Sequence, residues 1–224
     1  MQWEKLLFLH WSLPPAALSL LLPSGVTLEA HDGAAWLGIV PFVMRHVRPR
    51  FLPSVPGISG FPELNVRTYV NVDGVPGVWF FSLEAANPLA VRLARSGFHL
   101  PYFNARMRAR VDGGEVRFQS RRTHHRAAPA DFSARYRPVS GSLGDAKLTR
   151  FLTGRYCLYS ADRKGQLYRA DIFHAPWRLG RAEVELNVSP NAMTLPLGLR
   201  LPASPPLIHY AERTVVRAGF PYRV

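Results

Sequence analysis

The chain has 224 residues, 47% of them hydrophobic, which is long enough to bury a substantial core without disulfides or structural metal. Its single cysteine, Cys157, excludes an internal disulfide and is interpreted as a buried apolar thiol. The 28 lysines and arginines outnumber the 15 acidic residues and give a net charge of +13, so anionic partners must be considered.

The amino-terminal region shows no export or membrane signal. The apolar run from 6 to 22 is broken by His10, Pro14 and Pro15, and it predicts a strand followed by a helix that begins at a proline. The run from 34 to 44 is shorter than the roughly 20 residues that cross a bilayer. We expect a soluble cytoplasmic protein without a membrane partner. One domain, 1–224, is expected because no linker or repeat divides the chain.

Two hairpins and a helix are predicted in the first half of the chain. The hairpins join 26–30 to 34–44 around Asp32-Gly33, and 66–72 to 77–83 around Asp73-Gly74. The helix, 87–96, has Asn87 as its amino-terminal cap, Pro88 in its first turn and Gly97 as a left-handed residue beyond its end. Its expected apolar surface, packed against a cavity, includes Leu89, Val91, Leu93 and Ala94.

The second half reads as further strands with one helix. Strands are predicted at 103–111, 115–121, 155–161, 166–173, 184–188 and 207–216. Ser142 and Asp145 have capping-box spacing before a helix at 146–153, which Gly154 ends. Four prolines mark 191–206 as a loop or lid. The pattern predicts an α+β fold, predominantly antiparallel, forming a barrel with a central cavity and a few short helices.

Five segments carry a family resemblance that extends over nearly the whole chain. They are AWLGIVPFVM at 35–44, RPRFLP at 48–53, ELNVRTYV at 63–70, PGVWFFSL at 76–83 and LPYFNARM at 100–107. The chain resembles the YqjF-like family of uncharacterised bacterial proteins, within the acetoacetate decarboxylase-like superfamily. The resemblance implies a decarboxylase-like barrel with Glu63 at the superfamily's acidic position. In the decarboxylases a lysine pair follows the helix and its first lysine forms an imine, whereas Tyr102 and Phe103 stand at these positions here.

Schiff-base decarboxylation is not expected. An imine requires a primary amine with a lowered pKa, and a phenol with a pKa of about 10 cannot replace it. The chain has only Lys5, which precedes the first predicted strand, Lys147 in a predicted helix and Lys164 in a turn. All three are interpreted as solvated side chains.

The candidate site is a barrel cavity that binds a small organic acid or carbonyl compound. Asn65 and Arg67 follow Glu63 with the period of a strand and share its face. Tyr102 or Glu63 would act as general acid or base, and Arg67 would hold the anion. Two other ligand-binding candidates are Phe103 and His99. The alternatives are an internal Glu63–Arg67 ion pair and a core role for Tyr102, with its hydroxyl capping a strand.

An Arg-rich ribbon offers a competing function in nucleic-acid binding. Arg106, Arg108 and Arg110 share one strand face, and Glu115, Arg117, Gln119 and Arg121 share a face of the partner strand. The ribbon would contact phosphates if external, or an acid if it lined the cavity. The simpler interpretation is a solvated surface, because no nucleic-acid-binding motif accompanies the charge.

Other chemistry finds little support in the sequence. Nucleotide-binding, serine-hydrolase and zincin motifs are absent. The adjacent His124 and His125 point to opposite sides of an extended chain, and His209 is interpreted as a hydrogen-bonded structural histidine. We expect no metal and no cofactor, and a homo-oligomer remains open.

Overall fold

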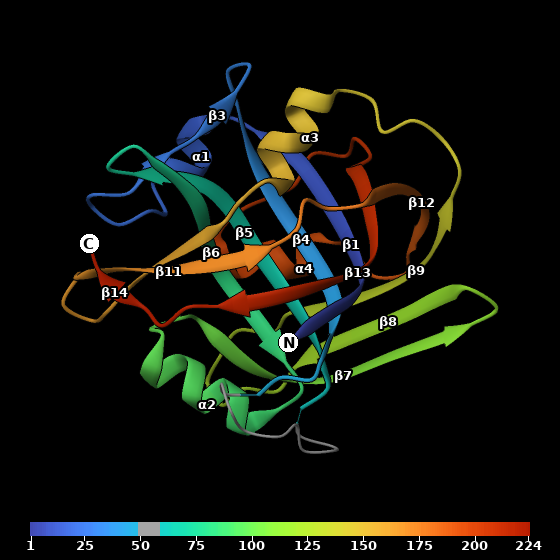
Figure 1. The fold of residues 1–224 in the computed structure, drawn as a ribbon, viewed down its shortest axis with the longest axis horizontal. Helices are drawn as coiled ribbons and strands as arrows, with labels where there is room; N and C mark the ends of the chain where they lie inside the picture. Colours follow the sequence, from blue (N-terminus) through green and yellow to red (C-terminus); the bar gives the residue numbers. More distant parts are fainter. Residues whose placement is uncertain (49–58) are drawn as a thin grey trace.

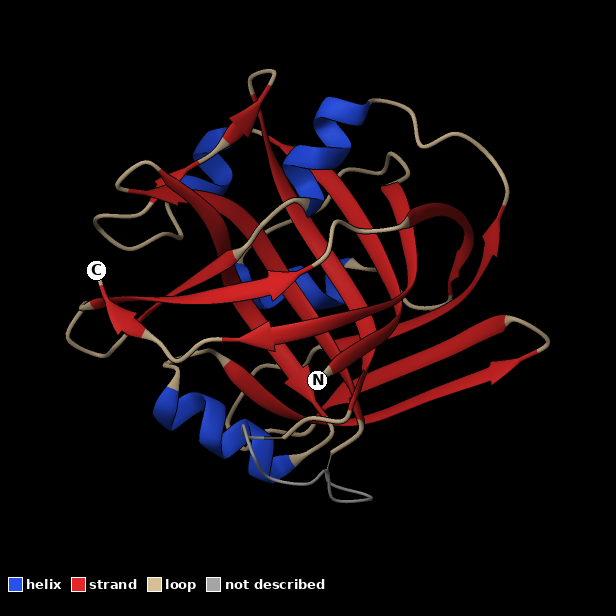
Figure 2. Ribbon diagram, in the orientation of Figure 1, coloured by secondary structure: helices blue, strands red, loops and turns tan. Residues whose placement is uncertain are grey.

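The computed structural model describes residues 1–48 and 59–224. These residues form mostly strands, and most of the short helices lie at the periphery (Figure 2). The RPRFLP segment lies outside the described residues from position 49 onward. Within the described ranges, no helix has both the length and the apolar character that crossing a membrane requires.

The strands join one sheet that closes into barrel-like rings (Figure 1). They are β1 (Gln2–Leu13), β2 (Thr27–Leu28), β3 (Ala30–His31), β4 (Ala34–Arg45), β5 (Phe61–Val72), β6 (Val75–Ala85), β7 (Tyr102–Asp112), β8 (Glu115–Arg122), β9 (Asp131–Val139), β10 (Cys157–Ala161), β11 (Leu167–His174), β12 (Leu179–Leu186), β13 (Leu207–Ala218) and β14 (Tyr222–Arg223).

Two rings share the strands β13, β1, β4, β5 and β6. The first ring closes through β10 and β11, because β11 pairs with β13. The second closes through β7, β8, β9 and β12, because β12 pairs with β13. The pairs β6–β7 and β6–β10 are parallel, and the other described pairs are antiparallel. The predicted antiparallel α+β fold is confirmed, although the barrel is a double ring.

The shared strands β1, β4 and β5 are buried on both faces. Along β1, Leu7, Leu9 and Trp11 pack into the main core against β8 and β9, whereas Phe8 and Trp3 point to the opposite side. Strict alternation would not keep residues 3 and 8 on one face. Lys5 has a φ of 54°, and the register with β4 shifts between Glu4 and Leu9, so a bulge reverses the alternation.

Two predicted hairpins form, one of them with altered pairing. β5 and β6 join through Asp73 and Gly74, whose φ values of 51° and 82° fit the type I′ turn that Asp-Gly favours. β3 and β4 join around Asp32 and Gly33 as predicted. The segment before that turn is divided, however, because β2 pairs with β5.

The helices are α1 (Pro15–Ser19), α2 (Pro88–Gly97), α3 (Ala146–Thr153), α4 (Asn191–Thr194) and the 3-10 helix η1 (Leu195–Leu197). The Asn87 side chain caps α2 by accepting the N–H groups of residues 89 and 90 at 3.0 and 3.1 Å, as predicted. Gly97 belongs to the helix, and His99, with a φ of 53°, is the left-handed residue, so that prediction was wrong. Leu89 and Leu93 were also misplaced, since their exposed fractions are 53% and 62%.

Two further expectations need correction. Asp145 alone caps α3, accepting the N–H groups of Lys147 and Leu148, while Ser142 contacts Gly144 instead. Of the predicted loop or lid at 191–206, residues 191–197 form α4 and η1 instead, whereas 198–206 are loop as predicted. Its residues Met193, Leu199 and Leu201 join the main core, and none of the segment lines the cavity.

Candidate functional site

A cavity of about 210 Å³ lies inside the first ring, on the face of β1, β4 and β5 opposite the main core. Its wall is mostly apolar and aromatic, with Trp3, Phe8, Phe42 and Trp177 among its members. Trp3 stacks on Trp177 with ring centroids 6.2 Å apart. A mostly apolar wall with a few polar groups is typical of small-molecule sites.

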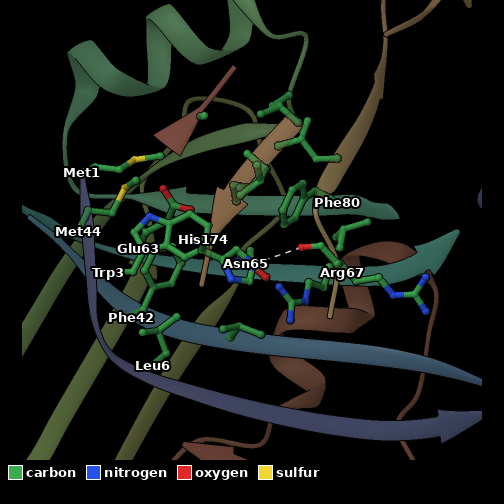
Figure 3. A pocket seen from close by; sticks show the side chains of 18 of the residues that line it. Met1, Trp3, Leu6, Phe42, Met44, Glu63, Asn65, Arg67, Phe80 and His174 are labelled. Atoms are coloured by element: carbon green, nitrogen blue, oxygen red, sulfur yellow. Dashed lines mark hydrogen bonds between the residues drawn. The ribbon is translucent and has the colours of Figure 1, made fainter. Parts of the chain in front are cut away.

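The four residues predicted to share one site do line this cavity. Strand β5 supplies Glu63, Asn65 and Arg67, which alternate with the core residues Leu64 and Val66. Figure 3 shows Asn65 between Glu63 and Arg67 along the strand. A rise of about 3.3 Å per residue separates the Cα atoms of positions 63 and 67 by about 13 Å, so the polar groups form a row. Tyr102, at the start of β7, lies at the Glu63 end.

Glu63 and Tyr102 form a buried acidic pair. The Tyr102 hydroxyl donates to Oε2 of Glu63 at 2.8 Å. Burial, with a further contribution from the Glu84 carboxylate, raises the pKa of Glu63 to about 8, against the opposing effect of the Tyr102 hydrogen bond. Burial and the neighbouring Glu63 raise the pKa of Tyr102 well above its usual value. At neutral pH Glu63 is therefore mostly a neutral carboxylic acid that can donate a hydrogen bond.

Arg67 is the cation at the other end of the row. Among the described residues no carboxylate lies within ion-pair distance of it, whereas Arg155, the other arginine on the cavity wall, is paired with Glu29. The expected alternative of a Glu63–Arg67 ion pair is therefore wrong. The Arg67 guanidinium lies 5.4 Å from the Phe8 ring centroid. Its Nε and the Oδ1 of Asn65 are buried and, within the described part of the chain, without a hydrogen-bond partner.

A buried His10–Tyr69 pair lies close to Arg67 and was not predicted. Nε2 of His10 is 2.6 Å from the Tyr69 hydroxyl, and the Tyr69 ring centroid is 5.7 Å from the Arg67 guanidinium. Burial, and then the Arg67 charge, lower the pKa of His10 well below its usual value. Gly38 pairs with both His10 and Arg67, and a Cβ there would lie 3.2 Å from the His10 ring. The glycine gives these two side chains room.

Two predicted ligand-binding residues lie outside the cavity. Phe103 follows Tyr102 on a strand, so it points to the opposite face. There it packs under Arg122, whose guanidinium is 4.1 Å from its ring centroid. His99, which has a left-handed backbone conformation, packs against Tyr168 with the rings tilted and their centroids 4.7 Å apart. His209 is buried and 3.0 Å from the Thr149 hydroxyl.

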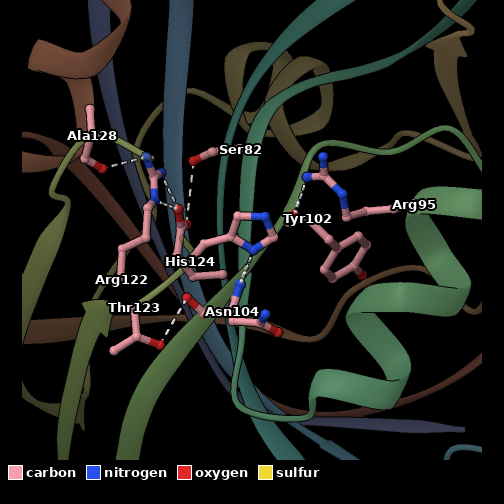
Figure 4. Close-up of polar contacts among 9 residues, drawn as sticks. Ser82, Arg95, Tyr102, Asn104, Arg122, Thr123, His124 and Ala128 are labelled. Carbon is pink, nitrogen blue, oxygen red and sulfur yellow. Dashed lines mark hydrogen bonds and ion pairs between the residues drawn. The ribbon is translucent and has the colours of Figure 1, made fainter. Parts of the chain in front are cut away.

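A second buried carboxylate, Glu84, is ion-paired with Arg122 (Figure 4). The exposed fractions of the two side chains are 0% and 5%. Burial raises the pKa of Glu84, and the Arg122 charge opposes that shift. Arg122 also donates to the carbonyl oxygen of Ala128 at 3.1 Å, and the Ser82 hydroxyl donates to Glu84 at 3.3 Å.

No described lysine lines the cavity. Lys5 lies within β1, not before it as predicted, and pairs with Glu212 at 2.5 Å. Lys147 and Lys164 are exposed, in α3 and in the turn between β10 and β11. Within the described ranges, no group of three or more His, Cys, Asp or Glu side chains is arranged to hold a metal ion.

The Arg-rich ribbon faces solvent. Arg106, Arg108 and Arg110 on β7 are exposed, and so are Arg117 and Arg121 on β8. Arg117 pairs with Glu115 at 2.9 Å. None of the ribbon residues lines the cavity. Of the two arrangements considered for the ribbon, the structure shows the external one.

Sequence reasoning missed most of the cavity wall. Trp3, Phe42 and the neighbouring pair His174 and Trp177 come from three segments far apart in the chain, and no local pattern marks them. Arg155 and Cys157 could have been grouped from the sequence, because residues two apart in a predicted strand share one face. Both do line the cavity.

The fold is that of the acetoacetate decarboxylase-like proteins. The acetoacetate decarboxylase of Legionella pneumophila superposes with a TM-score of 0.63 at 12% identity, covering 100% of this chain and 87% of that one. The enduracididine biosynthesis enzyme MppR complexed with pyruvate superposes with a TM-score of 0.64 at 13% identity, covering 99% and 88%.

The sequence comparisons give the family. Residues 1–215 match the DUF2071 family model, described as an uncharacterized conserved protein, and the chain belongs to this family. It is 44% identical over 213 residues to the uncharacterized protein YqjF of Bacillus subtilis strain 168, covering 94% of this chain and 86% of that protein.

Proposed function

We propose that the cavity binds a small organic acid that carries a carbonyl group and an apolar body. The observation that carries this proposal is the Arg67 cation, which has no carboxylate partner among the described residues and lies in a mostly apolar cavity. Arg67 is only partly exposed and its Nε is buried, so its charge is costly unless it is paired, and a ligand carboxylate would supply the pair.

The remaining features define the rest of the ligand. An engineered apolar cavity of about 150 Å³ holds benzene, so about 210 Å³ accommodates a ring or branched chain with a short acid group. At the other end of the row, neutral Glu63 donates to a carbonyl oxygen. The solved MppR complex with pyruvate is an example of a 2-oxo acid bound on this fold.

A thermal-shift series tests binding. Aryl and branched oxo acids in which several bonds separate the carbonyl from the carboxylate should raise the melting temperature with concentration, and the corresponding alcohols and amides should not. Arg67→Ala removes a charge-assisted hydrogen bond, so affinity should fall about tenfold to a hundredfold. Arg108→Ala is the matched control, since it removes the same charge from the ribbon. Equal responses of the two variants would refute the carboxylate site.

The same geometry supports proton abstraction next to the ligand carbonyl. The fraction of Glu63 that is ionised takes the α-proton, and the C–H electron pair moves onto the carbonyl oxygen. The Tyr102 hydroxyl, which donates to Glu63 in the structure, would then donate to that oxygen in place of neutral Glu63. Lysine takes no part. Exchange of the α-hydrogen for deuterium, followed by NMR, should increase as pH rises toward about 8, where Glu63 ionises. Glu63→Gln should abolish exchange but retain binding. Undiminished exchange by Glu63→Gln would exclude this role.

Nucleic-acid binding is the second candidate, favoured by Arg106, Arg108 and Arg121, which are exposed and form no ion pair with any described residue. Affinity for duplex DNA would fall by about 0.9 log units per log unit of salt for each phosphate neutralised. Arg106→Ala with Arg108→Ala should reduce that slope and leave the cavity response unchanged. Submicromolar, salt-sensitive binding combined with no thermal response to any acid would reverse the order of the two candidates.

A further inference from the structure

A second hollow lies on the other side of the cavity wall, between the end of α2 and the turn that joins β10 to β11. Its volume is about 840 Å³, and we call it the basic hollow. It presents the cationic side chains of Arg95, Arg163, Lys164 and Arg223 against a single carboxylate, that of Asp162. None of the four cations forms an ion pair with a carboxylate among the described residues.

The carboxylate in the basic hollow is already engaged by the backbone. Oδ1 of Asp162 accepts the N–H groups of Lys164 at 2.8 Å and Gln166 at 3.0 Å. Gly165, with a φ of 82°, completes the turn, and its N–H donates to the Asp162 carbonyl oxygen at 3.1 Å. The turn is therefore fixed by main-chain contacts, and the side chains of Arg163 and Lys164 are not needed to hold it.

Arg95 is held in place on the opposite side of the basic hollow. One guanidinium nitrogen donates to the carbonyl oxygen of Tyr102 at 2.7 Å, as Figure 4 shows. The guanidinium has five N–H donors, so others remain for a ligand. Arg223 comes from β14, which pairs with β11. Three separate elements thus direct cations toward one concavity.

We propose that the basic hollow binds the phosphate group of a small soluble molecule. Converging arginines and a lysine match the charge and the acceptor oxygens of a phosphate. The hollow is concave and within the size range of small-molecule sites, whereas a polymer such as DNA needs the extended surface that the Arg-rich ribbon provides. The proposal does not rest on the cavity ligand, because the basic hollow and the cavity have no lining residue in common.

The two sites share one wall, the segment 94–100. Ala94, Phe98 and Leu100 line the cavity, and Arg95 and His99 line the basic hollow. Since Arg95 also holds the main chain of Tyr102, a phosphate there contacts the residue that positions the cavity's phenol.

Calorimetric titration with pyrophosphate and with inorganic phosphate, at fixed ionic strength, tests the proposal. Wild-type protein should bind pyrophosphate, and the double variant Arg163→Ala/Lys164→Ala should bind it at least about tenfold more weakly. Arg106→Ala/Arg108→Ala removes the same charge from the ribbon and should bind as the wild type does. Circular dichroism checks that each variant is folded.

Three outcomes would overturn the proposal. These are no binding of either anion to the wild type, equal weakening by both double variants, and binding only to phosphatidylserine vesicles or a single-stranded oligonucleotide. Arg67→Ala should leave pyrophosphate affinity unchanged. Failure of the cavity proposal therefore appears in the acid titrations, and failure of this one appears in the pyrophosphate titrations.

Discussion

Arg67 and Arg122 have the same side chain as the arginines on the outer face of β7 to β9, but opposite surroundings. Arg122 is buried against Glu84, and Arg67 faces an apolar cavity. Arg106, Arg108 and Arg137 are exposed to water and screened by salt. The net charge of +13 is therefore a poor guide to where arginine matters. Desolvation decides how much each one contributes.

The largest expected difference concerns the buried ion pair. Arg122→Ala leaves the Glu84 carboxylate buried without its cation and should lower the free energy of unfolding by about 3–5 kcal/mol in urea denaturation. Arg108→Ala should change it by less than about 0.5 kcal/mol.

If Arg122→Ala fails to fold, the double variant Glu84→Leu/Arg122→Met provides the test. Removing both charges should recover much of the lost stability, because no buried charge is left unpaired. A double variant less stable than the single one would contradict the desolvation argument.

The next effect is a pH dependence that originates at Glu63. Its folded pKa, about 8, lies above the ordinary value of 4.5, because burial and the Glu84 carboxylate disfavour the charged form. The contribution of Glu63 to the free energy of unfolding is fully present below pH 4.5 and decreases as pH rises to about 8. The loss is at most about 1.4 kcal/mol per pH unit.

Urea denaturation of wild type and Glu63→Gln at several pH values isolates this contribution. The two stabilities should converge near pH 5, and the variant should be the more stable protein at pH 8. Burial lowers the pKa of His209 to about 4, so its contribution to stability changes with pH in the opposite direction. That contribution is the same in both proteins and cancels when their stabilities are subtracted. The free energy of unfolding of Glu183→Gln, a change at an exposed position, should vary with pH in the same way as that of the wild type. Parallel curves for Glu63→Gln would contradict the raised pKa.

The smallest effect belongs to an exposed ion pair. Arg137 and Glu183 are 2.6 Å apart, but their side chains are 62% and 61% exposed. Glu183→Ala should lower the free energy of unfolding by about 0–1 kcal/mol, and 1 M salt should remove the difference. A larger and salt-resistant effect would show that the outer face is less solvated than its exposure indicates.

Local signals predicted what depends on neighbours in the sequence. Asp73-Gly74 fixed the β5–β6 turn, and the period of two placed Glu63, Asn65 and Arg67 on one cavity wall. The same period argues against Phe103, since adjacent strand residues point to opposite faces. A left-handed residue was expected at Gly97 on propensity, but the helix continues through it and His99 takes that conformation.

What depends on distant segments could not be predicted. The bulge at Lys5 shifts the alternation of β1, and without it Trp3 and Phe8 would face opposite sides. The pairing of β11 with both β10 and β13, which closes the cavity, joins strands that have no recognisable sequence relation. Leu89 and Leu93 were expected to be buried on local hydrophobicity alone, whereas α2 packs through Val91.

The first residue of the chain lies on the cavity wall. Met1 lines the cavity, and its amino group donates to the carbonyl oxygen of Val216 at 3.1 Å. Any polypeptide extension ahead of Met1 would therefore start on the cavity wall. Binding assays on proteins with and without such an extension compare two different cavity walls, and their affinities are not interchangeable.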